Sequence, residues 1–167
     1  AHVTAQRFHA VVQRLEDVFG VVRSSTRIQQ GSTSVGSVAV ELAEKIFGDL
    51  EGCHVMVIGA GEMSRQTAQS LRSRGASSIF VSNRSFDKAE ELAAELDGEA
   101  VRFDDWEGTM KEVDIVVTST SAPPYILHPE MVSHAIHHRG GRSLFMIDIA
   151  VPRDIDPAVS DLEDVYL

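Results

Sequence analysis

The residues best placed to do chemistry are two glycines that follow a short apolar run. Residues 55–58 are β-branched or apolar, which is typical of a strand buried on both faces, and Gly59 and Gly61 then turn the chain into a predicted helix. Without side chains, these glycines let backbone N–H groups approach a diphosphate that faces the start of the helix. Ser64 takes the third small position, where Gly or Ala is usual. The predicted contacts are Gly59, Ala60, Gly61, Glu62, Met63 and Ser64.

A second group of polar residues follows the next expected strand, at residues 78–82. An NAD-selecting site places Asp or Glu at this point to accept a hydrogen bond from the ribose 2′-hydroxyl. Here the position holds Arg84, whose guanidinium can donate two parallel hydrogen bonds to a 2′-phosphate. Asp87 argues the other way but falls inside the next helix, and a solvated surface arginine is the alternative. The pattern predicts NADP as the cofactor, bound by Ser82, Asn83, Arg84 and Ser85.

A third group lies at the end of the predicted strand over residues 114–120. Ligands of open α/β sheets lie outside the carboxyl ends of the strands, so Ser119, Thr120 and Ser121 are expected to line the ribose or nicotinamide half of the cofactor. Plain capping of the strand end is an equal alternative. Asp148 ends the strand expected over residues 144–150. It could help to place the nicotinamide, although ordering the following loop through backbone hydrogen bonds is the favoured role.

Two other groups are weaker candidates. Cys53 precedes the first strand, at the wrong end of the sheet for catalysis, and is interpreted as a core or edge cysteine. His134 and His138, four residues apart on a predicted helix, could share a metal ion, but no third ligand is evident. They are interpreted as a solvated helix end, and no metal site is predicted.

The elements around these groups alternate between strand and helix. Apolar periodicity predicts helices over residues 62–74, 85–96, 104–111 and 129–138, with short strands between them and a last strand near residues 165–167. This alternation predicts an α/β fold with a doubly wound parallel sheet of the Rossmann type. Two further apolar helices, over residues 7–19 and 35–50, precede the first strand and are expected to form a linker.

Composition limits the function classes. The 167 residues suit one domain with a short extension, and no apolar run approaches the ~20 residues that cross a bilayer. A net charge of −10 makes the chain a poor candidate for holding a nucleic-acid backbone by itself. One cysteine and no signal peptide favour a cytoplasmic protein. Because the chain opens with Ala1, we expect a processed or excised piece of something longer.

Several of these segments together resemble glutamyl-tRNA reductase. They are residues 59–63, the step Asn83-Arg84-Ser85 and residues 148–154, and residues 22–28 and 34–43 are similar to the linker of that family. Shikimate dehydrogenases share the glycine turn and the Asn-Arg-Ser step. The pair Glu62-Met63 and residues 148–154 separate the two families.

This resemblance implies an oxidoreductase that reduces the glutamyl ester on a tRNA to glutamate-1-semialdehyde, which opens tetrapyrrole (porphyrin) biosynthesis. In that family a cysteine in a Cys-Asn-Arg motif forms a thioester, to which NADPH delivers hydride. The motif is absent here, as is the C-terminal helical segment that makes the family dimeric. We therefore expect a linker over residues 1–52 and an NADP-binding domain over residues 53–167, which binds cofactor without catalysing.

The partners implied are a glutamyl-tRNA held mainly by other domains, a second copy of the protein and a glutamate-1-semialdehyde aminomutase, with no membrane. Two alternatives stay open: the NADP-binding domain of a shikimate-dehydrogenase-like enzyme, and a non-enzymatic nucleotide-binding module.

Overall fold

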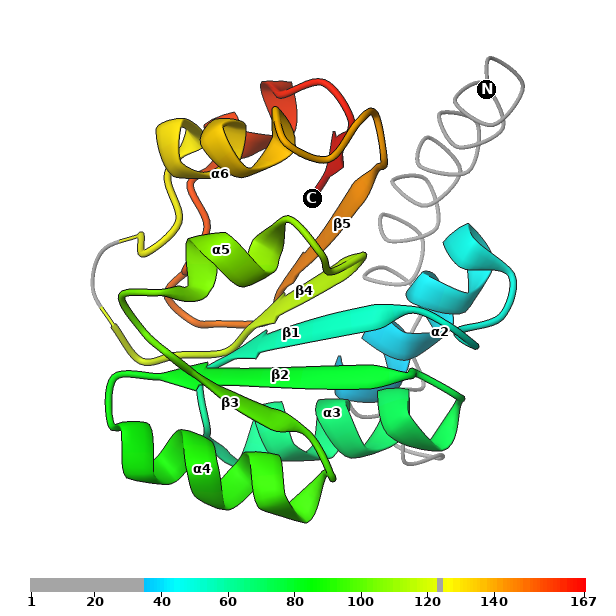
Figure 1. Ribbon diagram of the computed structural model, residues 1–167, viewed down its shortest axis with the longest axis vertical. Helices are drawn as coiled ribbons and strands as arrows, with labels where there is room; N and C mark the ends of the chain where they lie inside the picture. Colours follow the sequence, from blue (N-terminus) through cyan, green and yellow to red (C-terminus); the bar gives the residue numbers. More distant parts are fainter. Residues whose placement is uncertain (1–34, 123–124) are drawn as a thin grey trace, which may run out of the picture. The chain divides into compact units, whose positions relative to one another are not determined.

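The computed structural model describes residues 35–122 and 125–167, which belong to one compact unit. The helix predicted over residues 7–19 and the linker-like residues 22–28 lie outside the described residues. Six parallel strands form one sheet in the order β3-β2-β1-β4-β5-β6 (Figure 1). Their bounds are β1 His54–Ile58, β2 Ser78–Asn83, β3 Glu99–Arg102, β4 Ile115–Thr118, β5 Leu144–Asp148 and β6 Val165–Tyr166. The predicted doubly wound parallel sheet is confirmed.

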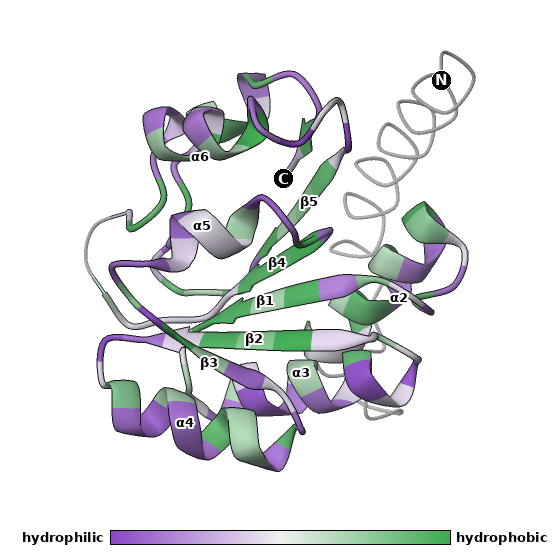
Figure 2. Cartoon of the chain, viewed as in Figure 1, coloured by the Kyte–Doolittle hydropathy of each residue, from purple (hydrophilic) through white to green (hydrophobic). Residues whose placement is uncertain are grey.

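Helices cover both faces of this sheet (Figure 1). One face carries α2 (Val35–Phe47), α3 (Glu62–Ser73) and α4 (Phe86–Glu95), and the other carries α5 (Trp106–Met110), α6 (Pro129–Ile136) and the 3-10 helix η1 (Pro157–Asp161). Alternate residues of β1 enter the two cores: Val55 and Val57 pack under α3, whereas Met56 and Ile58 pack toward α5 and α6. Apolar residues accordingly make up most of the central strands β1, β4 and β5 (Figure 2), as expected for parallel strands buried on both faces, whereas the edge strand β3 is mixed.

Two strands end earlier than predicted, and hydrogen bonds explain why. β4 ends at Thr118, since the N–H of Thr120 donates to the side chain of Asp154 instead of continuing the ladder. β5 ends at Asp148, since the N–H of Ala150 donates to the Asp148 carboxylate. Both strands therefore break at the same edge of the sheet, and that edge gains two irregular loops.

The helix expected over residues 35–50 is α2, which ends at Phe47 because Gly48 has φ +90°. It packs closely on α3, for a Cβ at Gly36 would lie 2.4 Å from the Oγ1 of Thr67. Ala39, Val40 and Ala43 of α2 belong to the core under α3 and α4. The division expected between residues 52 and 53 concerns the longer protein and stays a prediction. No helix of the described residues is long and apolar enough to cross a membrane.

Candidate functional site

A cavity of about 550 Å³ lies beyond the carboxyl ends of β1, β2, β3 and β4. Its walls are residues 59–63 after β1, residues 83–85 with Lys88 after β2, Phe103 after β3, and residues 119–122 with Ile126 after β4. The strand order reverses between β1 and β4, which places the cavity at the topological switch point of the sheet. Open α/β sheets bind their ligands at this point, and the volume suits a small-molecule ligand.

The glycine turn forms the floor of the cavity. Gly59 has φ +112°, a left-handed conformation that favours glycine, and a Cβ there would lie 2.4 Å from the backbone oxygen of Ser119. Gly61 is the N-cap of α3, and a Cβ there would have no atom within 4 Å. No side chain caps α3. The first N–H groups of this helix, which have no acceptor within it, can therefore donate to an anion.

The six residues predicted around the turn fall into two layers. Gly59, Ala60, Gly61, Glu62 and Met63 line the cavity. Ser64 does not line it: its side chain is fully buried, and its Oγ lies 3.4 Å from the backbone oxygen of Ser119, to which it donates. The third small position of the motif thus ties α3 to the segment after β4.

The wall after β2 is cationic. Of the four residues predicted to bind the cofactor here, Asn83, Arg84 and Ser85 line the cavity, whereas Ser82 is fully buried and does not line it. Lys88 also lines this wall, although it was not among the predicted contacts. Its spacing of four residues from Arg84, across the start of the helix, was the only sign in the sequence.

The charges on this wall have no internal partner. Among the described residues, neither Arg84 nor Lys88 forms an ion pair. The described residues of the wall include no acid, and Asp87 does not line the cavity. Two exposed cations without partners, in a chain of net charge −10, create a local site for an anion.

The wall after β4 holds Ser119, Thr120 and Ser121, the three residues that were expected to meet the cofactor there. The polar groups of Thr120 are occupied: its N–H donates to Asp154 Oδ2 at 2.7 Å, its hydroxyl donates to Asp154 Oδ1 at 2.5 Å, and Ala122 N–H donates to that hydroxyl at 3.2 Å. Burial raises the pKa of the Asp154 carboxyl, and the bonds from Thr120 oppose that shift. Sequence patterns did not single out Asp154, because nothing in them shows that the chain returns to the end of β4.

Asp148 does not line the cavity. Its carboxylate accepts from Thr118 Oγ1 at 3.1 Å and from the N–H groups of Ala150, Asp154 and Ile155, each at 3.0 Å. These bonds order the loop after β5, which is the role that the sequence favoured. No bond of Asp148 in the described residues reaches a cavity residue directly.

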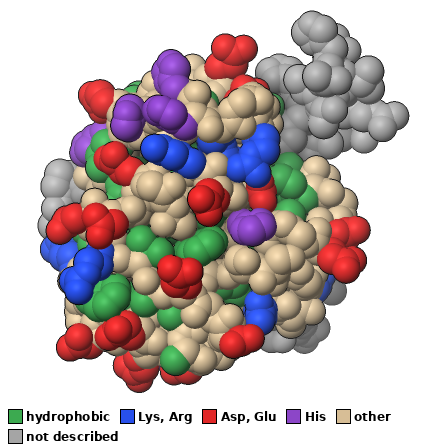
Figure 3. All heavy atoms as spheres, in the orientation of Figure 1, with side chains coloured by type: hydrophobic (Ala, Val, Ile, Leu, Met, Phe, Trp, Pro, Cys, Tyr) green, Lys and Arg blue, Asp and Glu red, His purple; other side chains and the backbone are tan. Residues whose placement is uncertain are grey.

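The two weaker candidates lie away from the cavity. Cys53 is buried before β1, and burial, followed by the charges of Asp114 and Asp49, raises the pKa of its thiol. Histidine side chains gather over the end of α6 (Figure 3). Within the described ranges, no group of three or more His, Cys, Asp or Glu side chains is arranged to hold a metal ion.

The sheet order, the glycine turn at the start of α3 and the cavity at the switch point define a dinucleotide-binding domain of the Rossmann type, the class that binds nicotinamide cofactors. The chain belongs to the shikimate / quinate 5-dehydrogenase family, whose model matches residues 41–167.

Among individual proteins, the chain is similar to glutamyl-tRNA reductases. It is 49% identical to that of Akkermansia muciniphila over 167 residues, which cover all of this chain and 49% of that protein. It is 50% identical to that of Methanosarcina acetivorans over 146 residues, which cover 87% of this chain and 32% of that protein. The chain therefore spans about half, or less, of the length of these relatives. The resemblance to this family is confirmed.

Solved structures agree with this similarity. The glutamyl-tRNA reductase from Methanopyrus kandleri matches with a TM-score of 0.76 and 42% identity, covering 92% of this chain and 39% of that one. The nucleotide-binding domain of glutamyl-tRNA reductase from Thermoplasma volcanium has a TM-score of 0.56 at 19% identity, covering 81% of this chain and 86% of that one, and shows the shared fold alone.

Proposed function

We propose that this chain is the NADPH-binding part of a glutamyl-tRNA reductase. The observation that carries the cofactor assignment is that Arg84 and Lys88 both line the wall after β2 and that neither forms an ion pair with another described residue. An NADP 2′-phosphate brings close to two negative charges and fits such a wall, whereas the hydroxyl of NAD leaves both cations unmatched. The open space at Gly61 leaves room for the pyrophosphate.

Each wall of the cavity takes one part of the cofactor in this proposal. The turn and the start of α3 bind the pyrophosphate through backbone N–H groups, with Ser64 supporting them from below. The wall after β2 holds the adenosine ribose, with Ser82 beneath Asn83, Arg84 and Ser85. The wall after β4 lines the nicotinamide half through Ser119 and Ser121, and Thr120 and Asp148 shape that wall from within.

The activity proposed for the whole protein is the reduction of glutamyl-tRNA to glutamate-1-semialdehyde in tetrapyrrole biosynthesis. The bound NADPH supplies the hydride, and the cysteine that forms the thioester belongs to a part of the protein outside this chain. The contribution of this chain is to bind and orient the cofactor. In this proposal the protein acts in the cytoplasm, and other parts of it make most of the contacts with the tRNA, with a second copy of the protein and with an aminomutase. A tRNA held mainly by other parts is consistent with the net charge of −10 of this chain.

A shikimate-type dehydrogenase is the second candidate, because the family model that matches carries that name. Identities of 44–50% to glutamyl-tRNA reductases favour the first. The full-length protein distinguishes them: a reductase consumes NADPH with glutamyl-tRNA and is inert toward shikimate. Turnover of shikimate with NADP would reverse the assignment.

The cofactor proposal is tested by titrating the chain with NADPH and NADH. We expect NADPH to bind more tightly, and Arg84→Ala or Lys88→Ala each to weaken NADPH binding by about 1–3 kcal/mol while NADH binding stays unchanged, since only NADPH carries the third phosphate. Lys45→Ala, an exposed cation on α2 that does not line the cavity, is the matched control. Equal affinity for the two cofactors would rule out the 2′-phosphate site.

A further inference from the structure

One buried aspartate, Asp154, joins three segments on the nicotinamide side of the cavity through its side chain and its backbone. The side chain of Asp154 accepts both bonds of Thr120, and its backbone oxygen accepts from Ile126 N–H at 2.7 Å and Leu127 N–H at 3.1 Å. Its own N–H donates to Asp148 at 3.0 Å. Asp154 is fully buried, yet it does not line the cavity. It therefore acts on the site only through the residues that it holds.

Asp154 holds three residues of the wall after β4, through its carboxylate and its backbone oxygen. Thr120 is bound to it directly, Ala122 is bound to the Thr120 hydroxyl, and Ile126 is bound to the Asp154 backbone. These are three of the five residues that line the cavity on this side. The other two are serines, and in the part of the chain that the structure describes no hydrogen bond engages the hydroxyl of Ser119 or Ser121. The wall thus consists of an anchored frame that presents two available hydroxyls.

From this arrangement we propose that Asp154 is a positioning residue for the nicotinamide half of the cofactor, which it serves by holding Thr120 and thereby the placement of Ser119 and Ser121. The inference rests on the proposed function, because it assumes that a nicotinamide dinucleotide fills the cavity. The adenosine half is assigned to a different wall, after β2, and none of the hydrogen bonds of Asp154 to described residues reaches that wall. A substitution of Asp154 should therefore weaken binding of the nicotinamide half of the cofactor and leave binding of the adenosine half unchanged.

The test uses two probes that share the adenosine half. NADPH spans both walls, whereas 2′,5′-ADP carries the 2′-phosphate and adenosine but no nicotinamide. Asp154→Asn keeps the shape of the side chain but turns one acceptor into a donor, which faces a donor of Thr120. We expect its NADPH affinity to fall about tenfold or more, while its 2′,5′-ADP affinity stays within about twofold of wild type.

Asp156→Asn is the matched control. Asp156 lies two residues further on, accepts from Ala158 N–H at 2.9 Å and pairs with His128, but does not line the cavity. We expect both affinities to stay at the wild-type level. A general loss of stability would lower the apparent affinity for both probes together, so only a difference between the probes indicates positioning.

Thr120→Val supplies a second route, because it removes the hydroxyl donor and keeps the N–H. We again expect weaker NADPH binding with unchanged 2′,5′-ADP binding. In the Asp154→Asn, Thr120→Val double variant, the loss of NADPH binding free energy should be smaller than the sum of the two single losses. If the wild-type chain binds neither probe, the proposed function fails and this inference with it. If wild type binds both and the variants weaken both equally, or neither, Asp154 has no positioning role and the proposed function stands. Should Asp154→Asn fail to fold, Thr120→Val alone decides on the same criteria.

Discussion

The two glycines of the turn lack side chains for different reasons. At Gly59 the obstacle is the protein itself, since a Cβ would meet the backbone oxygen of Ser119 at 2.4 Å and the φ is +112°. A Cβ at Gly61 would have no atom within 4 Å, and the φ of −82° suits any residue. The first glycine is therefore required by the fold, and the second only by what enters the cavity. The motif alone does not separate these roles.

This difference predicts opposite behaviour for two alanine variants. Gly59→Ala should lower the free energy of unfolding by about 2–4 kcal/mol, because strain and a clash with backbone act together. Gly61→Ala should change stability by less than about 0.5 kcal/mol and still abolish most NADPH binding, because its methyl group takes the space of the pyrophosphate. Denaturant unfolding and NADPH titration of both variants measure this. A Gly61→Ala chain that binds NADPH normally would place the pyrophosphate elsewhere.

Asp154 gives stability a dependence on pH. Because burial raises the pKa of its carboxyl in the folded protein, the folded state keeps a proton that the unfolded state has already lost. Stability from this group is therefore highest below the unfolded value of about 3.9 and falls as pH rises through the folded value. The wild-type chain should gain stability relative to Asp154→Asn when the pH is lowered from about 7 into that window. Unfolding of both proteins at several pH values measures this gain, and a difference that is constant with pH would contradict it.

At the scale of elements, local patterns predicted the alternation of strands and helices but not where the chain crosses back on itself. The buried strands and the glycine turn follow from apolar runs and from residue conformation, which are local properties. Asp154 was missed because it joins the site through a tertiary contact, and Lys88 because its position on α4 gives little sign that it lines the cavity. Thr120 was expected to meet the cofactor, yet its hydroxyl is used by Asp154 and Ala122. Long-range hydrogen bonds, which no local pattern encodes, decide which side chains at a strand end are available.

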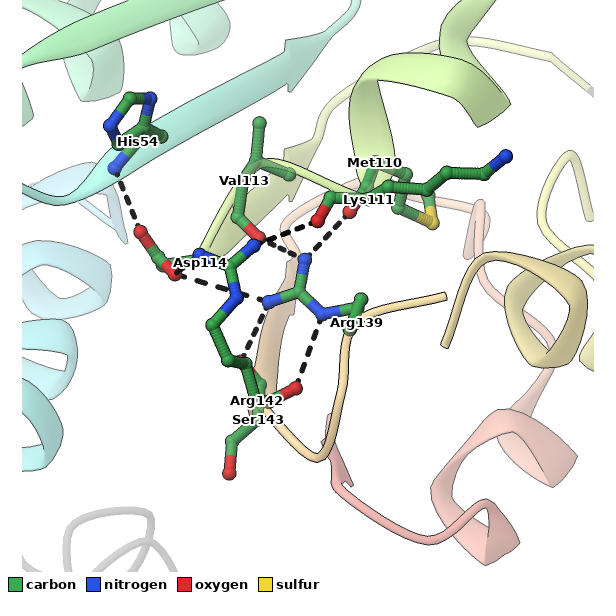
Figure 4. A network of polar contacts seen from close by, with 8 residues as sticks. All are labelled: His54, Met110, Lys111, Val113, Asp114, Arg139, Arg142 and Ser143. Atoms are coloured by element: carbon green, nitrogen blue, oxygen red, sulfur yellow. Dashed lines mark hydrogen bonds and ion pairs between the residues drawn. The ribbon is translucent and has the colours of Figure 1, made fainter. Parts of the chain in front are cut away.

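At the amino ends of β4 and β5, a buried arginine holds several segments together through long-range hydrogen bonds (Figure 4). Arg139, just after α6, donates to the backbone oxygens of Met110 at 2.7 Å, Ser143 at 2.9 Å and Arg142 at 3.2 Å, and also to that of Val113. Its guanidinium joins the end of α5 to the segments that lead into β4 and β5. Burial, with the charge of Arg142, lowers its pKa, and Asp114 at 3.9 Å opposes this.

Replacing this arginine should destabilise the fold without touching the site. Arg139→Met leaves buried carbonyl oxygens without a donor, so we expect a loss of about 2–4 kcal/mol in the free energy of unfolding. Arg142→Met should cost less than about 1 kcal/mol, because that side chain is half exposed. Denaturant unfolding compares the two. NADPH affinity measured where both variants are folded should equal that of wild type, and a selective loss in Arg139→Met would contradict a purely structural role.

At the scale of the whole molecule, α2 precedes the dinucleotide motif in the sequence but belongs to its core. Ala43 of α2 is fully buried, and the ring of Phe47 lies 6.5 Å from that of Phe145 on β5. Gly36 allows the close approach to Thr67 on α3. The helix whose first N–H groups are proposed to bind the pyrophosphate, α3, thus lies beside α2 on the same face of the sheet.

Two truncated chains test whether α2 is needed for the fold. A chain of residues 34–167 should unfold cooperatively and bind NADPH, because it contains the whole compact unit. A chain of residues 53–167 should lose at least about 3 kcal/mol, since removing α2 returns its own buried side chains and the facing surface of α3 to water. Its NADPH affinity should fall with its folded fraction. Equal stability of the two chains would show that α2 is a detachable linker, and the functional domain would then begin at the first strand.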